Sequence, residues 1–145
     1  MEYGLVLLWL ATVAGLAAIA APLASLVFAP LSDRGGTLAL PFALAVVGVV
    51  SYLVGQVAFG WPALLASLAV LGGGSAFALS RDHEPDWESV GLGLAAVAVG
   101  FGLVVAIRNA EPGIYAGGGE KFLDFGLLKT LVRADSLPPE DFWYA

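Results

Sequence analysis

The 145 residues are 59% hydrophobic and only 12% charged, and their mean hydropathy is +0.89; soluble domains carry about 25% charged residues. Twelve acidic residues against six Lys and Arg give a net charge of −6, which excludes nucleic acid as a partner because such partners need a basic surface. The absence of Cys excludes disulfides and thiolate metal sites. The acidic, Lys-poor composition is typical of a halophilic organism.

Three long stretches carry no charge at all: 3–32, 35–80 and 89–107. A charge at the membrane centre costs about 2.5–3.5 kcal/mol, so we interpret these stretches as membrane-spanning. At about 20 residues per span, they predict four transmembrane helices, at 4–29, 37–59, 62–79 and 89–107. The middle stretch is divided at Gly60-Trp61-Pro62, where Pro suits a first helical turn. Because this break lacks charge, a re-entrant pair or one long bent helix is the alternative.

The first apolar stretch is predicted to be a retained span and not a signal peptide, because no Lys or Arg precedes it. The orientation of the spans is not determined by charge. Arg34 and Arg81 lie in turns on one side, Arg108 and Lys121 lie on the other, and the positive-inside rule gives a tie.

The composition changes after Arg108, and residues 108–145 are predicted to leave the membrane. A short helix is expected from Glu120 to Arg133, because its acids fall in the first turn and its bases toward the last, as the helix dipole favours. We therefore predict an all-α polytopic protein of the cell membrane. Four transmembrane helices occupy residues 1–107, and a juxtamembrane helix and loop occupy 108–145.

Glu120 and Asp124 are the residues most suggestive of chemistry. At a spacing of four they project from one face of the predicted helix, together with Leu127, Leu128 and Leu131. Two carboxylates on an otherwise apolar face could hold a divalent cation or act as a general base. The alternative is a helix N-terminus stabilised by its own acids.

Two further positions carry weaker signals. Asp141 lies among prolines and aromatic residues, a setting that is typical of carbohydrate contacts and equally of a membrane-surface loop. His83 is the only histidine and is expected to be a solvated turn residue. A Ser-His-Asp arrangement would need this histidine, and no nucleophile elbow is present.

The tail resembles a known family. Gly118-Gly119-Glu120-Lys121-Phe122-Leu123-Asp124-Phe125, followed by Leu137-Pro138-Pro139-Glu140-Asp141-Phe142-Trp143-Tyr144-Ala145, is similar to the opening of the signature region of the "YYY" polytopic membrane proteins of archaea and Chloroflexi. Those proteins are longer, and they look related to glycosyltransferases of the GT-C fold. The resemblance implies that this chain is the N-terminal part of a longer protein and is inactive alone.

By the same resemblance, the activity would be sugar transfer from a polyprenyl-phosphate donor. Asp124 and Glu120 would be the catalytic or metal-binding acids, and the metal would be Mg or Mn. Asp141, Trp143 and Lys121 would contact the substrate. Two other interpretations stay open, a non-enzymatic scaffold or assembly subunit and a transporter fragment, although the predicted spans lack the acids that transport favours.

Overall fold

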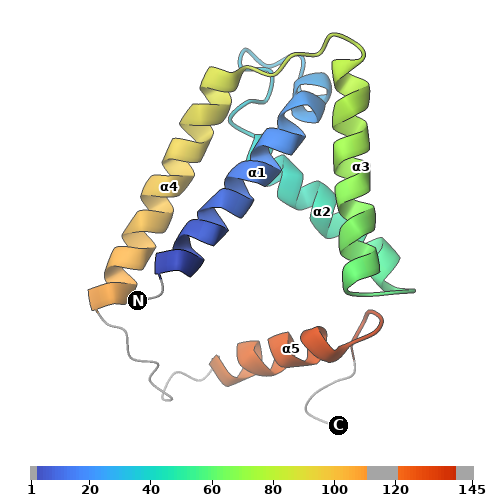
Figure 1. Ribbon diagram of the computed structural model, residues 1–145, viewed down its shortest axis with the longest axis vertical. Coiled ribbons are helices and arrows are strands. Elements are labelled where there is room, and N and C mark those ends of the chain that lie inside the picture. Colours follow the sequence, from blue (N-terminus) through green and yellow to red (C-terminus); the bar gives the residue numbers. More distant parts are fainter. Residues whose placement is uncertain (1–2, 111–120, 140–145) are drawn as a thin grey trace.

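The computed structural model describes residues 3–110 and 121–139. Within these ranges the fold is all α, which confirms the predicted fold class. It has five helices: α1 (Tyr3–Val27), α2 (Ala39–Gly55), α3 (Trp61–Leu79), α4 (Trp87–Ala110) and α5 (Lys121–Arg133) (Figure 1). The short helix predicted from Glu120 to Arg133 is confirmed over Lys121–Arg133, and Glu120 lies outside the described residues.

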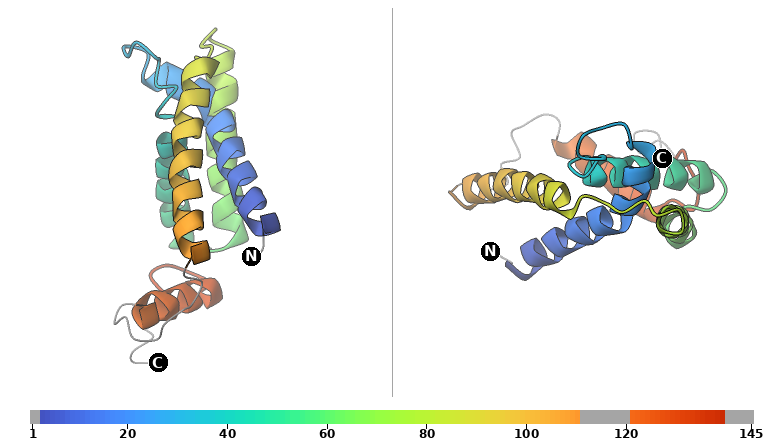
Figure 2. Two further views of the ribbon diagram at one scale, coloured as in Figure 1. Left: turned by 90° about the vertical axis from the view of Figure 1, so that its left-hand side faces the viewer. Right: turned by 90° about the horizontal axis from the view of Figure 1, so that it is seen from above.

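The first four helices run alternately in opposite directions, and α5 lies across one end of them (Figures 1 and 2). The start of α1, the α2–α3 connection and α5 all lie at that end. The α1–α2 and α3–α4 loops lie at the opposite end. Within residues 3–110 and 121–139, the charged side chains are therefore gathered at the two ends.

Three of the helices, α1, α3 and α4, are long and apolar enough to cross a membrane. The predicted second span is shorter than expected, because α2 has 17 residues and ends at Gly55 instead of residue 59. At 1.5 Å per residue it measures roughly 26 Å, at the lower end of the range for a span. The break before α3 is confirmed: Gly60 adopts φ +86°, which glycine tolerates, and Pro62 lies in the first turn of α3.

Small residues form the contacts between the helices. The buried apolar side chains are mostly alanines, and Leu71 of α3 is the largest side chain that is fully buried. It packs with Ala20 and Ala43 where α1, α2 and α3 meet. Large apolar side chains of α1, α2 and α3 are exposed on the outer surface of the bundle. This distribution is the reverse of a water-soluble core and suits helices that associate in lipid through close backbone approach.

Serine hydroxyls join the same three helices. Ser75 of α3 donates to the carbonyl of Ile19 in α1 at 2.5 Å, and the hydroxyls of Ser51 in α2 and Ser67 in α3 lie 2.7 Å apart. A hydroxyl without a partner is costly in an apolar environment. These bonds therefore favour one pairing of the helices over other arrangements of the same apolar surfaces.

Helix α4 joins the others only near its start. Val90 is buried with Ala17, Ala21 and Ala39, whereas the remainder of α4 is largely exposed and Val99 is 74% exposed. Two glycines allow this junction. A Cβ on Gly36 would lie 2.7 Å from the Cβ of Ser89, and one on Gly93 would lie 3.1 Å from the carbonyl oxygen of Thr37. The α1–α2 loop therefore lies directly against the first turns of α4.

Two carboxylates fix this end of the molecule. Hydrogen bonds from the hydroxyl and backbone of Thr37, and from the backbone of Gly35, hold the pKa of Asp33 below its ordinary value of 3.8. Hydrogen bonds from the hydroxyl and backbone of Ser89 lower the pKa of Asp86 in the same way. Asp86 is placed to cap the start of α4.

We expect acid to loosen this end of the protein. A carboxylate with a lowered folded pKa contributes stability above its unfolded pKa, and that stability is lost as the pH falls through the folded value. The loss should therefore begin below about pH 4. Unfolding midpoints in detergent between pH 6 and 2 should fall less for D33N and D86N than for the native chain. An unchanged acid loss in D33N and D86N would contradict this assignment.

Candidate functional site

Asp124 is the one predicted site residue for which the structure describes both the backbone and the exposure of the side chain. Asp124 lies in the first turn of α5, and its side chain is exposed. Lys121 is the first residue of the same helix. Glu120, Asp141 and Trp143 lie outside the described residues, so the predicted pairing of Glu120 with Asp124 stays a prediction.

Helix α5 carries a continuous apolar face. Phe125, Leu128 and Val132 are 66%, 60% and 78% exposed, and their spacing of three and four residues puts them on one side of the helix. Asp124 borders this side, because Leu128 and Leu131 follow it at spacings of four and seven. The carboxylate therefore lies at the edge of an apolar strip that no other described helix covers.

The position of α5 indicates where the apolar strip lies relative to the other helices. The helix lies across the end of α1 to α4 in two perpendicular views (Figures 1 and 2). An amphipathic helix that lies across the ends of spans is suited to the interface between lipid and water. Within the described residues, no group of three or more His, Cys, Asp or Glu side chains could hold a metal ion. A metal at Asp124 would therefore need a carboxylate from outside these ranges.

A short segment after α5 holds it to the bundle. The amide of Phe59 donates to the carbonyl of Asp135, and the amide of Leu137 donates to the carbonyl of Gly55, both at 2.7 Å. The second bond uses a carbonyl at the end of α2. We refer to residues 134–137 as the tether. The sequence analysis did not predict the tether, because its partners lie about 80 residues away and only the Gly60-Trp61-Pro62 break indicated the place.

We expect Gly55→Val to loosen the tether. A Cβ at position 55 would lie 2.9 Å from Cδ2 of Phe59 and 3.0 Å from Cδ1 of Leu137, so a branched side chain displaces the segment that the Gly55 carbonyl holds. Amide hydrogen exchange at Leu137 should be faster by about three- to tenfold, the equivalent of one net hydrogen bond. Gly48→Val is the matched control, because a Cβ there meets nothing within 4 Å. Equal exchange in the two variants would contradict the role of Gly55.

These features define a class of protein: a helical membrane protein that carries an exposed acid on a helix at one end of its apolar helices. A family model described as "Uncharacterized membrane protein (DUF2298)" matches residues 46–145. The match covers more than two-thirds of the chain, and the chain belongs to this family. No curated protein and no solved structure matches it.

The match bears on the resemblance drawn from the tail. It begins within α2 and continues through α3, α4 and α5 to the end of the chain, so it includes both tail segments on which the resemblance depends. Its description confirms that the family is one of membrane proteins. The link to GT-C glycosyltransferases remains a prediction.

Proposed function

We propose that this chain is the N-terminal part of a multi-pass glycosyltransferase of the cell membrane, which uses a polyprenyl-phosphate sugar as donor. The observation that supports the proposal is the position of Asp124. Its exposed carboxylate borders an exposed apolar strip on a helix at the ends of the apolar helices. The sugar of a lipid-linked donor would meet a water-borne acceptor at this depth.

The proposed reaction is an inverting transfer. A nucleophilic O–H or N–H group of the acceptor attacks the anomeric carbon, the bond from that carbon to the phosphate oxygen breaks, and polyprenyl phosphate leaves with the bonding electrons. Asp124 takes the proton of the acceptor as general base. Glu120, four residues before it in the sequence, is the second candidate for this role. Lys121, Asp141 and Trp143 are proposed substrate contacts.

The residues fit a divalent metal by their chemistry. Carboxylate oxygens are the hard ligands that Mg and Mn prefer, and Asp124 with Glu120 would supply two of them. When bound, such an ion would stabilise negative charge on the leaving phosphate. In this alternative to the general-base role, Asp124 and Glu120 would hold the ion and orient the acceptor.

The rival function is a non-enzymatic scaffold or assembly subunit. It is favoured by the broad apolar surface of α1 and α4, whose outer side chains no described helix covers. Both functions place the chain in a membrane, and they differ in whether the acids on and before α5 act on a substrate.

The test is sugar transfer by a full-length family member that contains these residues, reconstituted in liposomes. The assay follows the release of polyprenyl phosphate from a labelled donor. We expect release that depends on acceptor and that falls when EDTA removes divalent cations. Absence of transfer from several donor sugars, while the protein is folded and inserted, would favour the scaffold.

A further inference from the structure

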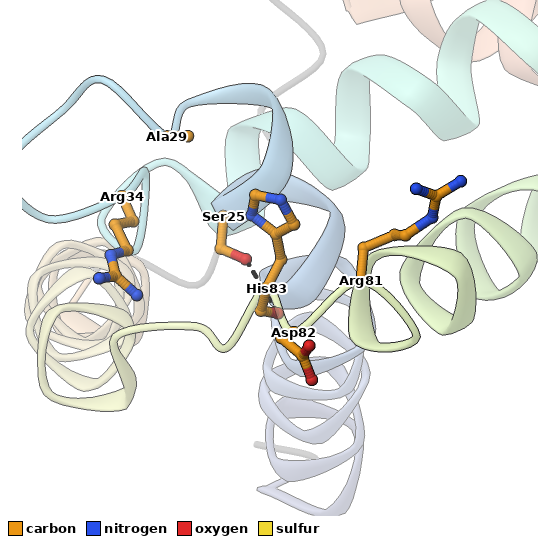
Figure 3. A pocket seen from close by; sticks show the side chains of 6 residues that line it. All are labelled: Ser25, Ala29, Arg34, Arg81, Asp82 and His83. Carbon is orange, nitrogen blue, oxygen red and sulfur yellow. Dashed lines mark hydrogen bonds between the residues drawn. The ribbon is translucent and has the colours of Figure 1, made fainter.

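A polar pocket lies at the end of the molecule opposite α5. It is formed where the last turn of α1 meets the α1–α2 and α3–α4 loops, and it has a volume of about 350 Å³. Its lining is Ser25, Ala29, Arg34, Arg81, Asp82 and His83 (Figure 3). The proposed sugar-transfer site does not use it.

The α3–α4 loop is held in place at this pocket. The amide of Asp82 donates to the carbonyl of Leu79, and the amide of His83 donates to the carbonyl of Ala78. With Asp82 at φ +60°, these bonds form a Schellman motif, whose left-handed position usually holds Gly. The buried hydroxyl of Ser25 donates to the carbonyl of Pro22 at 2.7 Å, and the carbonyl of His83 lies 3.2 Å from the same hydroxyl as a second, longer acceptor. Two helices therefore fix the backbone from which the His83 imidazole projects.

Arg34 occupies an unfavourable backbone conformation. It has φ +49°, Gly35 follows with φ +74°, and the amide of Gly36 donates to the carbonyl of Asp33. Two positive φ angles in succession define a type I′ turn, which favours Asn, Asp or Gly at the position of Arg34. An arginine there is disfavoured by about 1 kcal/mol or more. The turn would form more easily with Gly, so the arginine side chain at this position lowers the stability of the turn at the edge of the pocket.

The side chains that line the pocket include more hydrogen-bond donors than carboxylate acceptors. In Figure 3, Arg34 and Arg81 lie on opposite sides of His83. Among the described residues, neither guanidinium takes part in a side-chain hydrogen bond, and Arg81 lies over the ring of Phe77 at 5.1 Å. Asp82 is the one carboxylate that lines the pocket. The nearby Asp33 and Asp86 already accept hydrogen bonds from their own loops.

The apolar side chains near the pocket indicate its depth. Val27, Leu31, Leu79 and Trp87 are exposed, and they lie at the ends of α1 and α3, in the loop after α1 and at the start of α4. Trp is enriched where hydrocarbon meets headgroups. Lipid phosphates lie just outside this level, within reach of arginine side chains.

We propose that this pocket binds the phosphate group of a membrane lipid headgroup. Arg34 donates charge-assisted hydrogen bonds to the phosphate oxygens, and the His83 imidazole offers a second donor. Arg81 reaches the same phosphate once its side chain leaves the ring of Phe77. Asp82 accepts a hydrogen bond from a hydroxyl or ammonium group of the headgroup. Inorganic phosphate could accept the same hydrogen bonds from the arginine and histidine side chains. It has no acyl chains to contact the exposed apolar side chains, and it has no headgroup hydroxyl or ammonium group to donate to Asp82.

The test uses the full chain in dodecyl maltoside, a detergent without phosphate. Binding is followed by native mass spectrometry and by the thermal unfolding midpoint, with three probes: a short-chain phosphatidylglycerol, the corresponding diacylglycerol and inorganic phosphate. We expect phosphatidylglycerol to bind most tightly and diacylglycerol not to bind at this site. Inorganic phosphate that binds as tightly as phosphatidylglycerol would overturn the assignment to a lipid.

Variants separate binding from folding. Arg34→Gly should fold at least as well as the native chain, because φ +49° suits Gly, and yet its affinity for phosphatidylglycerol should fall by about tenfold, the loss of one charge-assisted pair. Arg34→Gln with Arg81→Gln should lose more. Arg108→Gln, at the other end of α4, should bind as the native chain does. Native affinity in Arg34→Gly and in the double variant would overturn the proposal.

Discussion

Replacing Asp124 by Asn in a full-length family member is expected to lower the rate of sugar transfer by about 10²- to 10⁴-fold, the usual contribution of a positioned general base. The amide keeps the size and exposure of the side chain but cannot take the proton of the acceptor. The fold should be unaffected, because Asp124 is exposed. The measurement is the initial rate of polyprenyl-phosphate release at saturating donor.

Asp135→Asn is the matched control for this prediction. Asp135 is also an exposed acid near α5, and its backbone carbonyl, not its carboxylate, receives the hydrogen bond from Phe59. Its substitution should therefore leave the rate unchanged. Glu120→Gln is expected to reduce the rate if the two acids share a metal. Native rates in both Asp124→Asn and Glu120→Gln would remove these residues from the mechanism.

Leu71→Ala is expected to give the largest loss of stability among single truncations of the described helices. Leu71 is fully buried where α1, α2 and α3 meet. Lipid is as apolar as the protein interior, so the transfer term is small in a membrane, and the cost comes from the cavity. A cavity the size of the lost side chain costs about 1–2 kcal/mol.

The control for this prediction is Leu65→Ala on the same helix. Leu65 is 61% exposed, so its truncation leaves no cavity and should change the free energy of unfolding by less than about 0.5 kcal/mol. Both free energies can be measured by titration with sodium dodecyl sulfate in mixed micelles. Equal losses in the two variants would mean that the contact of α1, α2 and α3 does not determine stability.

The helices could be predicted from the sequence because lipid imposes a simple requirement. Charge-free stretches of span length admit little other than helices, and Gly60 with Pro62 marks the break before α3. The end of α2 could not be predicted, since the amide of Phe59 and the carbonyl of Gly55 bond to the tether. No local pattern indicates a contact between residues so far apart in the chain.

The candidate site was predicted in part. The arrangement of acids and bases placed Asp124 in the first turn of α5, as the structure has it. The exposed apolar strip beside it follows from the leucine spacing, but the position of α5 across the ends of the other helices depends on the tether. The pocket at the opposite end was not predicted. Arg34 and His83 are far apart in the sequence, and the left-handed conformation of Arg34 gives no sequence signal.

The central claim is that lipid surrounds α1 to α4. The interpretation of the fold, the proposed reaction and the proposed lipid site all depend on it. The chain has no Cys, so single-cysteine variants report on one position each. On this premise hydrocarbon surrounds Val99, which is 74% exposed. In proteoliposomes opened to both sides, Cys at Val99 should therefore resist a charged maleimide, because a thiolate does not form in hydrocarbon. Cys at Asp82 in the α3–α4 loop should react readily. Equal labelling of the two positions would contradict the account.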